Sequence, residues 1–162
     1  DNVITNNIIV NPGNNALRFD DRAREGALEN GWFTHAHVGS GDMWEALYNS
    51  PWQSETWQNA FPEYKNCTDD ISKSDSPDYI PNPASTFKDN IIINKNMGYG
   101  EVYSSVWKFS DISENAIYNL GKCDEIFVDI DNGDYNIKDI DEIRKDAPDF
   151  KEIPLDMIGR VN

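Results

Sequence analysis

Two adjacent carboxylates followed by an arginine, Asp20-Asp21-Arg22, are the sharpest candidate for chemistry in this sequence. In an extended segment, neighbouring side chains point to opposite faces, so one aspartate can face a groove while the other turns inward toward Arg22. Glycoside hydrolysis needs two carboxyl groups beside the scissile bond, one as proton donor and one as base or nucleophile. Asp42 and Asp70 are further carboxylates of the same region. A buried structural ion pair would use the same triplet, and the residues alone leave both interpretations open.

The region after this triplet holds both histidines and most of the tryptophans. His35 and His37 share one face of an extended segment, a geometry that suits proton transfer, a sugar contact or a metal ion. No third ligand accompanies them at a recognisable spacing, so we expect no metal site, and an exposed loop pair remains the simpler interpretation. Most of the aromatic residues should form a local core. Trp32 and Trp52, which lie off the expected helical faces, are the better candidates for stacking on a sugar ring.

The acidic segment DIDNGDYNIKDID (129–141) resembles a calcium loop only superficially. An EF-hand loop needs glycine at its sixth position and glutamate at its twelfth. Counted from Asp129, Gly133 is fifth and Ile140 is twelfth. The segment is better interpreted as a strand pair joined by an Asn-Gly turn at 132–133. We expect no cofactor, with calcium on these aspartates left as an alternative.

The composition limits the partners of the chain. Its formal net charge is −15 and its pI is about 4.3, so nucleic acid and anionic membrane surfaces should be repelled. No apolar run approaches the length of a transmembrane helix. The two cysteines, Cys67 and Cys123, form no zinc or redox motif, and the sequence leaves open whether they carry a disulfide or two thiols.

A triplet of β-branched residues between asparagines occurs twice, at 7–11 and at 90–94. Such triplets suit short parallel strands that stack in register, because asparagine tolerates the left-handed backbone of a bend and its amide can bond to the asparagine above it. The distance between the copies is too long for one repeat, which predicts an aromatic-rich insertion over 23–82 within a single domain of 162 residues.

Other elements follow from shorter signals. Strands are expected at 101–109, 116–120, 125–130 and 134–137, where β-branched and aromatic residues lie between Asn, Asp and Gly. Short helices are expected within 41–49 and 54–61, the second beginning at Ser54. Another helical turn is expected within 137–148, as part of a C-terminal cap over 138–162.

The order of motifs along the chain carries a resemblance to a known family. It runs through ALRFDDR (16–22), GW (31–32), WEALYNSPWQSETWQNAFPEY (44–64), TDDISKSDSPDYIPNP (68–83), DNIIIN (89–94) and DFKEIPLDMIG (149–159). This order resembles the C-terminal part of the right-handed parallel β-helix glycoside hydrolases of bacterial plant-glycan degraders. The segments AREGALEN (23–30) and THAHVGSGD (34–42) depart from the pattern of that family.

The resemblance implies an all-β fold, consisting of the last coils of a right-handed parallel β-helix with a long, partly helical insertion. It implies extracellular glycan cleavage by a secreted or cell-surface bacterial protein, with preceding coils of the same protein covering the first strand edge. A non-catalytic glycan-binding or structural module is the alternative. Asp20 and Asp21 would be catalytic, and a polysaccharide or oligosaccharide would contact Arg22, Trp32, His35, His37 and Trp52.

Overall fold

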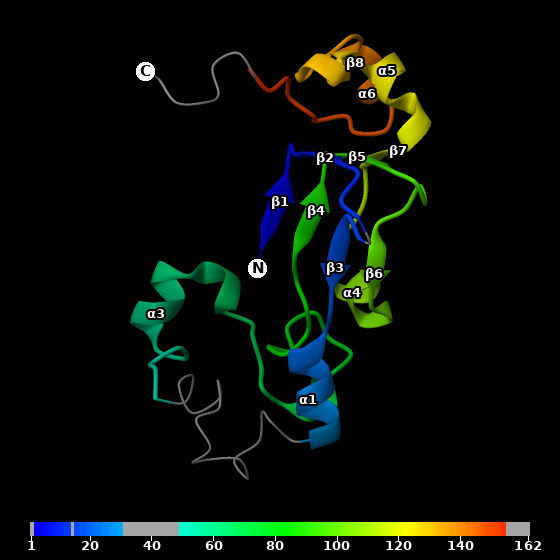
Figure 1. Ribbon diagram of the computed structural model, residues 1–162. Helices are drawn as coiled ribbons and strands as arrows, with labels where there is room; N and C mark the ends of the chain where they lie inside the picture. Colours follow the sequence, from blue (N-terminus) through cyan, green and yellow to red (C-terminus); the bar gives the residue numbers. More distant parts are fainter. Residues whose placement is uncertain (1, 14, 31–48, 155–162) are drawn as a thin grey trace. The chain divides into compact units, whose positions relative to one another are not determined.

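The asparagine-bounded triplets pair in parallel, as their repetition predicts. The computed structural model describes residues 2–13, 15–30 and 49–154. In it β2 (Ile8–Val10) pairs with β5 (Ile91–Asn94), and β5 pairs with β7 (Ala116–Asn119), as Figure 1 shows. Ile8 lies opposite Ile91, and Ile91 lies opposite Ala116. The prediction that 7–10 and 90–93 lie in neighbouring parallel strands is therefore confirmed.

Two further parallel pairs accompany this sheet. Strand β1 (Val3–Thr5) pairs with β4 (Thr86–Lys88), and β3 (Leu17–Phe19) pairs with β6 (Gly100–Val102). We call residues 2–11, 85–94 and 110–119 the first, second and third rows. Each row has a corner residue with a left-handed backbone at the matching position, namely Asn6 (φ 59°), Asp89 (φ 50°) and Glu114 (φ 51°), and the first row has a second such residue at its end, Asn11 (φ 46°). The corners therefore repeat in register, directly before the asparagine of each row.

The predicted fold class is nevertheless wrong. The sheets are small and separate, none of them curls or closes within the described residues, and helices contribute as much as strands, so the chain is neither all-β nor a right-handed parallel β-helix. The left-handed corners give the physical reason. A corner at Asn6 or Asp89 ends one strand and starts another, so the first and second rows each contribute to two short sheets rather than to one continuous wall.

The third row continues into an acidic segment of short helices and one hairpin. Here η4 (Leu120–Lys122) and α5 (Cys123–Ile126) precede β8 (Phe127–Asp129), and η5 (Ile130–Asn132) leads to β9 (Asp134–Ile137) and α6 (Ile140–Ile143). Strands β8 and β9 pair antiparallel, and Gly133 turns between them with a φ of 80°. The predicted strand pair with an Asn-Gly turn and the helical turn within 137–148 are confirmed.

This segment packs its apolar side chains on the row triplets. Ile91 and Ile93 of β5 are fully buried, and Phe127, Ile143 and Phe150 join them in one cluster. Such burial removes apolar surface from water at about 25 cal/mol per Å², the main favourable term for a fold of this size. The middle row is therefore the centre of the core.

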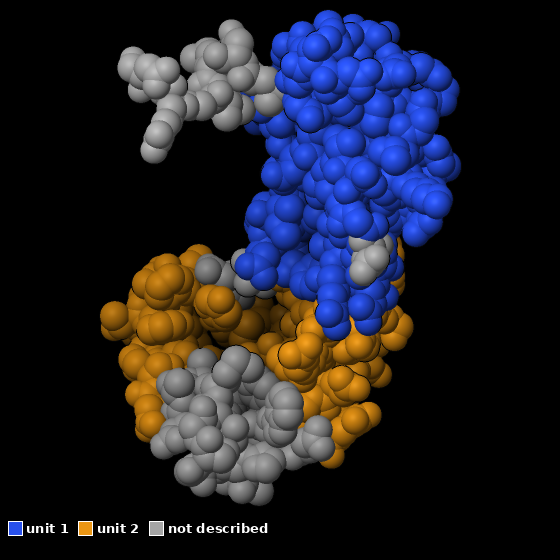
Figure 2. All heavy atoms as spheres, viewed as in Figure 1, with its two compact units in different colours: residues 1–19, 85–102, 110–162 blue, residues 20–84, 103–109 orange. Residues whose placement is uncertain are grey.

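The chain divides into two compact units, coloured in Figure 2. The first unit comprises residues 1–19, 85–102 and 110–162, and the second comprises 20–84 and 103–109. The second unit contains α1 (Arg22–Asn30), α3 (Glu55–Ala60), η2 (Pro62–Tyr64), η3 (Ile71–Lys73) and α4 (Ser104–Phe109). The predicted insertion, 23–82, lies wholly within this second unit.

Helix α3 begins where the sequence predicts. The Ser54 side chain accepts a hydrogen bond from the Trp57 amide at 3.2 Å, which satisfies one of the free donors of the first turn. Most of the helix expected within 41–49 lies outside the described residues. The strand expected over 101–109 is wrong after Val102, because Ser104 starts helix α4, which buries Val106 completely. The strand expected over 125–130 is shorter than predicted, since α5 extends to Ile126.

The helices and the two cysteines can be compared with the sequence expectations. Among the described residues, no helix has the length and apolar character needed to cross a membrane. No disulfide joins Cys67 to Cys123, and both carry thiols. Burial raises the pKa of the Cys123 thiol above its ordinary value.

Candidate functional site

The Asp20-Asp21-Arg22 triplet lies where β3 gives way to α1, and its two aspartates have different partners. The Arg22 guanidinium donates to Asp20 Oδ2 at 3.0 Å, and the Arg22 amide donates to Asp20 Oδ1 at 3.4 Å. The Arg22 side chain is 70% exposed, so this is a solvated ion pair rather than a buried anchor. Pairs of this kind contribute about 0–1 kcal/mol.

Asp21 is tied instead to helix α4. Its carboxylate accepts a hydrogen bond from the hydroxyl of Ser105, which is only 8% exposed. Its carbonyl accepts from the Glu25 amide in the first turn of α1. Asp21 thus holds two helices of the second unit together. Sequence reasoning missed Ser105 because the residues around it were expected to form a strand.

A second charged group of the same unit is centred on Asp75. The Lys108 ammonium donates to Asp75 Oδ1 at 2.6 Å, and the Arg24 guanidinium lies 3.9 Å from the same oxygen. The Lys108 hydrogen bond holds the pKa of Asp75 below its ordinary 3.8. Arg24 also lies over the Phe109 ring, 5.7 Å from its centroid. These contacts engage Arg24 and Lys108, so both basic side chains have a structural role in the second unit.

The predicted sugar-contact residues are only partly described. Trp52 is 5% exposed, so its ring belongs to the core of the second unit and offers little face to a ligand. Trp32, His35 and His37 lie outside the described residues, as does Asp42. Asp70 caps η3 by accepting from the Ser72 amide and hydroxyl, and these bonds lower the pKa of Asp70.

Exposed aromatic rings occur at α3 and η2 instead. The Trp57 and Phe61 centroids are 4.9 Å apart, and those of Phe61 and Tyr64 are 6.4 Å apart. Phe61 is 42% exposed and Tyr64 is 38% exposed. The sequence suggested that these rings would be core residues, whereas they form an aromatic surface on the second unit.

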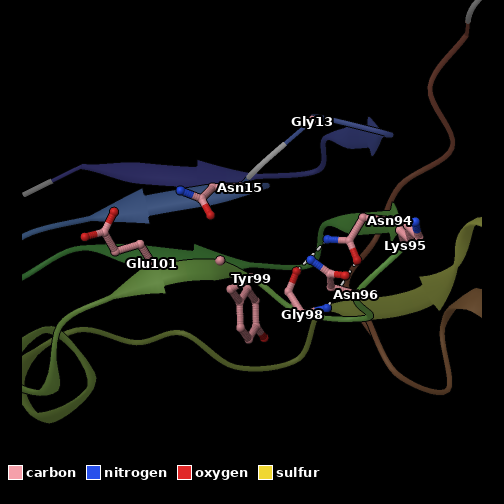
Figure 3. Close-up of a pocket in the computed structure, with 9 residues that line it drawn as sticks. Gly13, Asn15, Asn94, Lys95, Asn96, Gly98, Tyr99 and Glu101 are labelled. Carbon is pink, nitrogen blue, oxygen red and sulfur yellow. Dashed lines mark hydrogen bonds between the residues drawn. The ribbon is translucent and has the colours of Figure 1, made fainter.

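The first unit contains a polar hollow of about 490 Å³, which we call the asparagine hollow (Figure 3). It lies where β5 ends and β6 begins, beside the loop that precedes β3. Its volume falls within the range of small-molecule sites. The lining residues share small or polar side chains: Gly13, Asn15, Asn94, Lys95, Asn96, Gly98, Tyr99, Gly100 and Glu101.

Two close contacts shape the hollow. Asn94 Nδ2 donates to the Gly98 carbonyl at 2.6 Å, and the Gly98 amide donates back to Asn94 Oδ1 at 3.2 Å, which fixes the turn after β5. At Gly100 the backbone has a φ of 117°, and a Cβ there would lie 2.6 Å from the side chain of Asn15. Only glycine fits this position, so Asn15 can lie directly against the backbone of β6.

The groups that face a ligand in this hollow are mainly amides. The side chains of Asn15 and Asn96 have no hydrogen-bond partner among the described residues, whereas Glu101 pairs with Arg18 at 3.2 Å. The Tyr99 ring points away from Asn15 in Figure 3, and its hydroxyl accepts from Asn115 at 3.2 Å. The hollow therefore offers mainly hydrogen-bond donors and acceptors, and Tyr99 is the one aromatic residue among those that line it.

No family model, curated protein or solved structure matches the chain. The geometry therefore carries the functional argument. Within the described ranges, no group of three or more His, Cys, Asp or Glu side chains could hold a metal ion. In the acidic segment 129–141, Asp129, Asp134 and Asp139 each accept hydrogen bonds within their own turn.

A smaller hollow of about 310 Å³ lies beside α5 and α6. Three of its lining groups are carboxylates, but each already has a partner. Glu125 pairs with Lys122, Glu142 pairs with Lys145, and Asp139 accepts from the first amides of α6. This hollow offers a ligand fewer unpaired groups than the asparagine hollow does.

Proposed function

We propose that the protein binds glycan, with one sugar unit in the asparagine hollow. The observation that carries this proposal is the pair of unpartnered amides, Asn15 and Asn96, on a hollow of about 490 Å³. A carboxamide both donates and accepts, and sugar hydroxyls require both functions. A ligand without hydroxyl groups would form no hydrogen bonds with these amides and would gain no binding free energy from them. The hollow therefore favours a polyhydroxylated partner.

The charges near the hollow favour a ligand without strong net charge. Lys95 and Glu101 have opposite signs, and Arg18 neutralises Glu101. The net charge of −15 further disfavours polyanions. Among the described lining residues Glu101 is the one carboxylate, and glycoside hydrolysis needs two, so binding without cleavage is the function that this geometry supports best.

Binding can be tested on an array of plant and bacterial oligosaccharides, followed by titration calorimetry with each glycan that binds. We expect Asn96→Ala and Lys95→Ala to weaken binding about tenfold each, the cost of about one hydrogen bond to a well-placed group. Asn136→Ala is the matched control, because Asn136 is an exposed asparagine on β9 of the same unit. Unchanged affinity in both hollow variants would refute this site, and loss of binding in Phe61→Ala instead would assign the glycan to the aromatic surface.

Glycan cleavage by Asp20 and Asp21 is a second candidate. One observation favours it: Asp20 pairs with Arg22, whereas Asp21 accepts from Ser105. Two carboxylates in different environments can take the separate roles of proton donor and base or nucleophile. Reducing-end release from each bound glycan would measure it. We expect Asp20→Asn and Asp21→Asn each to abolish cleavage, with Asp20→Asn leaving the melting temperature nearly unchanged because its partner Arg22 is solvated. Release that persists in both variants would eliminate this candidate.

A further inference from the structure

The three rows are joined by a ladder of asparagine side chains that runs in one direction. The Asn7 amide and Nδ2 donate to Asn90 Oδ1 at 3.0 and 2.9 Å. The Asn90 amide and Nδ2 donate to Asn115 Oδ1 at 3.0 and 2.9 Å. The side-chain oxygens of Asn90 and Asn115 thus each accept two hydrogen bonds from the row before them.

The two ends of this ladder differ. At the third row, Asn115 Nδ2 donates to the hydroxyl of Tyr99 and to the carbonyls of Phe87 and Ser113, so that end is closed. At the first row, Asn7 Oδ1 has no donor among the described residues. The asparagine at the first row is also exposed, whereas Asn90 is fully buried. The first row therefore presents an acceptor whose counterparts in the next two rows are both satisfied.

A series of hydrogen bonds from the C-terminal segment also ends at the first row. The amide of Asp149 donates to Asp89 Oδ1 at 2.8 Å, and the amide of Lys151 donates to Asn6 Oδ1 at 2.6 Å. These contacts join every second residue of the C-terminal segment to the corner of successive rows. The Ile153 amide, next in this series, has no partner among the described residues, although its half-buried side chain packs against the apolar cluster.

The first row also has an open strand edge. Asn7 and Asn11 bond to row two through their backbones, so by the alternation of a parallel ladder Ile8 and Val10 direct their backbone groups away from β5. The side chains of Ile8, Ile9 and Val10 are only half-buried, while Ile91, Ile92 and Ile93, flanked on both sides, are fully buried.

We propose that this edge binds an extended polypeptide segment in parallel to the first row. The segment carries an Asp or Asn at a left-handed corner, then an Asn, then an apolar triplet. Its Asn would donate through its amide and Nδ2 to Asn7 Oδ1, its corner side chain would accept from the Ile153 amide, and its triplet would cover β2. Main-chain pairing would supply affinity and the corner would supply register, as in other strand additions.

The occupant should be a separate segment rather than a second copy of this protein. All three corner-plus-asparagine pairs of a copy are already engaged in its own rows, and its closed third row has no Nδ2 donor left for Asn7. The full charge of a copy, −15, would also oppose close stacking.

A fluorescein-labelled peptide that copies residues 85–94 provides the probe, with fluorescence anisotropy and amide hydrogen exchange as readouts. We expect saturable binding and protection of the Ile8 and Val10 amides. A peptide with leucine in place of its Asn90-equivalent should bind about tenfold more weakly, because it lacks the Nδ2 donor.

Two protein variants test the edge itself. Val10→Pro removes an N–H that points away from β5, so no hydrogen bond to β5 is lost. Proline is tolerated at such positions of an edge strand, so the variant should fold but no longer bind the peptide. Asn7→Leu should lose the Asn-dependent part of the affinity, and Asn136→Ala, an exposed substitution on β9 of the same unit, should bind normally. Equal binding of the peptide to wild type and Val10→Pro would overturn the proposal. Protection of Ile8 and Val10 that rises with protein concentration alone would overturn it in favour of a second copy.

Discussion

Replacing Asn90 by alanine should be the most damaging single substitution in the asparagine ladder. Its Nδ2 donates to the carbonyls of Ile4 (3.1 Å) and Lys88 (2.8 Å) and to Asn115 Oδ1 (2.9 Å), while its Oδ1 accepts from the amide and side chain of Asn7. Asn90 is fully buried, so water cannot readily replace the three bonds that its Nδ2 donates.

The expected cost follows from those five contacts. A net contribution of about 1 kcal/mol per hydrogen bond would give about 5 kcal/mol if all were independent, and a stranded buried carbonyl costs about 1–3 kcal/mol. Two of the bonds involve Asn7, which is exposed and can bond to water instead. We therefore expect Asn90→Ala to lower the free energy of unfolding of the first unit by about 4 kcal/mol, a large share of a typical total of about 5–15 kcal/mol.

The assay must distinguish the two units. All five tryptophans lie in residues 20–84 and 103–109, so their fluorescence reports on the second unit. Hydrogen exchange at the amides of Ile91 and Ile93 reports on the first. Urea titration should show the loss in the exchange signal, while Asn96→Ala, at an exposed position, should stay within about 0.5 kcal/mol of wild type. A loss below 1 kcal/mol for Asn90→Ala would refute the view that the ladder stabilises the rows.

Three further substitutions have clear expected outcomes. Gly100→Ala should lower the melting temperature, with a cost above about 1 kcal/mol, since its Cβ would lie 2.6 Å from Asn15 at a φ of 117°; a wild-type melting curve would contradict the account of the hollow. The folded pKa of Asp75 is depressed, so the stability it contributes is present above pH 3.8 and lost as the pH falls through the folded pKa. Lys108→Met should remove that acid dependence from tryptophan fluorescence, and an unchanged acid titration would count against the pair. Ser54→Ala should destabilise α3 by about 1 kcal/mol through loss of its cap, detectable as faster exchange at the Trp57 amide, and unchanged exchange would show that the cap is dispensable.

The sequence predicted correctly which short strands pair, but it predicted wrongly that these strands close into a β-helix. The repeated triplet at 7–11 and 90–94 specifies which residues pair and in which register, because asparagine and β-branched side chains favour that arrangement themselves. Whether the paired strands join into a continuous wall depends on the corner residues, and the corner at Glu114 carries a residue type that rarely adopts a left-handed backbone. Helix α4 was missed for a related reason, since its β-branched and aromatic residues favour a strand until tertiary packing buries Val106.

The candidate site was predictable only in part. The Asp-Asp-Arg triplet indicated an ion pair, and one exists between Asp20 and Arg22. The residue types alone could not show that this pair is exposed to solvent. The asparagine hollow was missed, although the run of asparagines and glycines from Asn94 to Gly100 was a usable signal for a tight turn with close backbone approach.

The insertion between the first two rows also has a kinetic consequence. Asn7 and Asn90 are 83 residues apart in sequence, whereas Asn90 and Asn115 are 25 apart. The longer closure costs about 1 kcal/mol more in chain entropy, from (3/2)RT ln of the ratio of lengths. The second and third rows can therefore pair early during folding, and the first row should dock last and detach first. A native chain that opens in this order would expose β5, the most apolar strand, before the remaining structure unfolds.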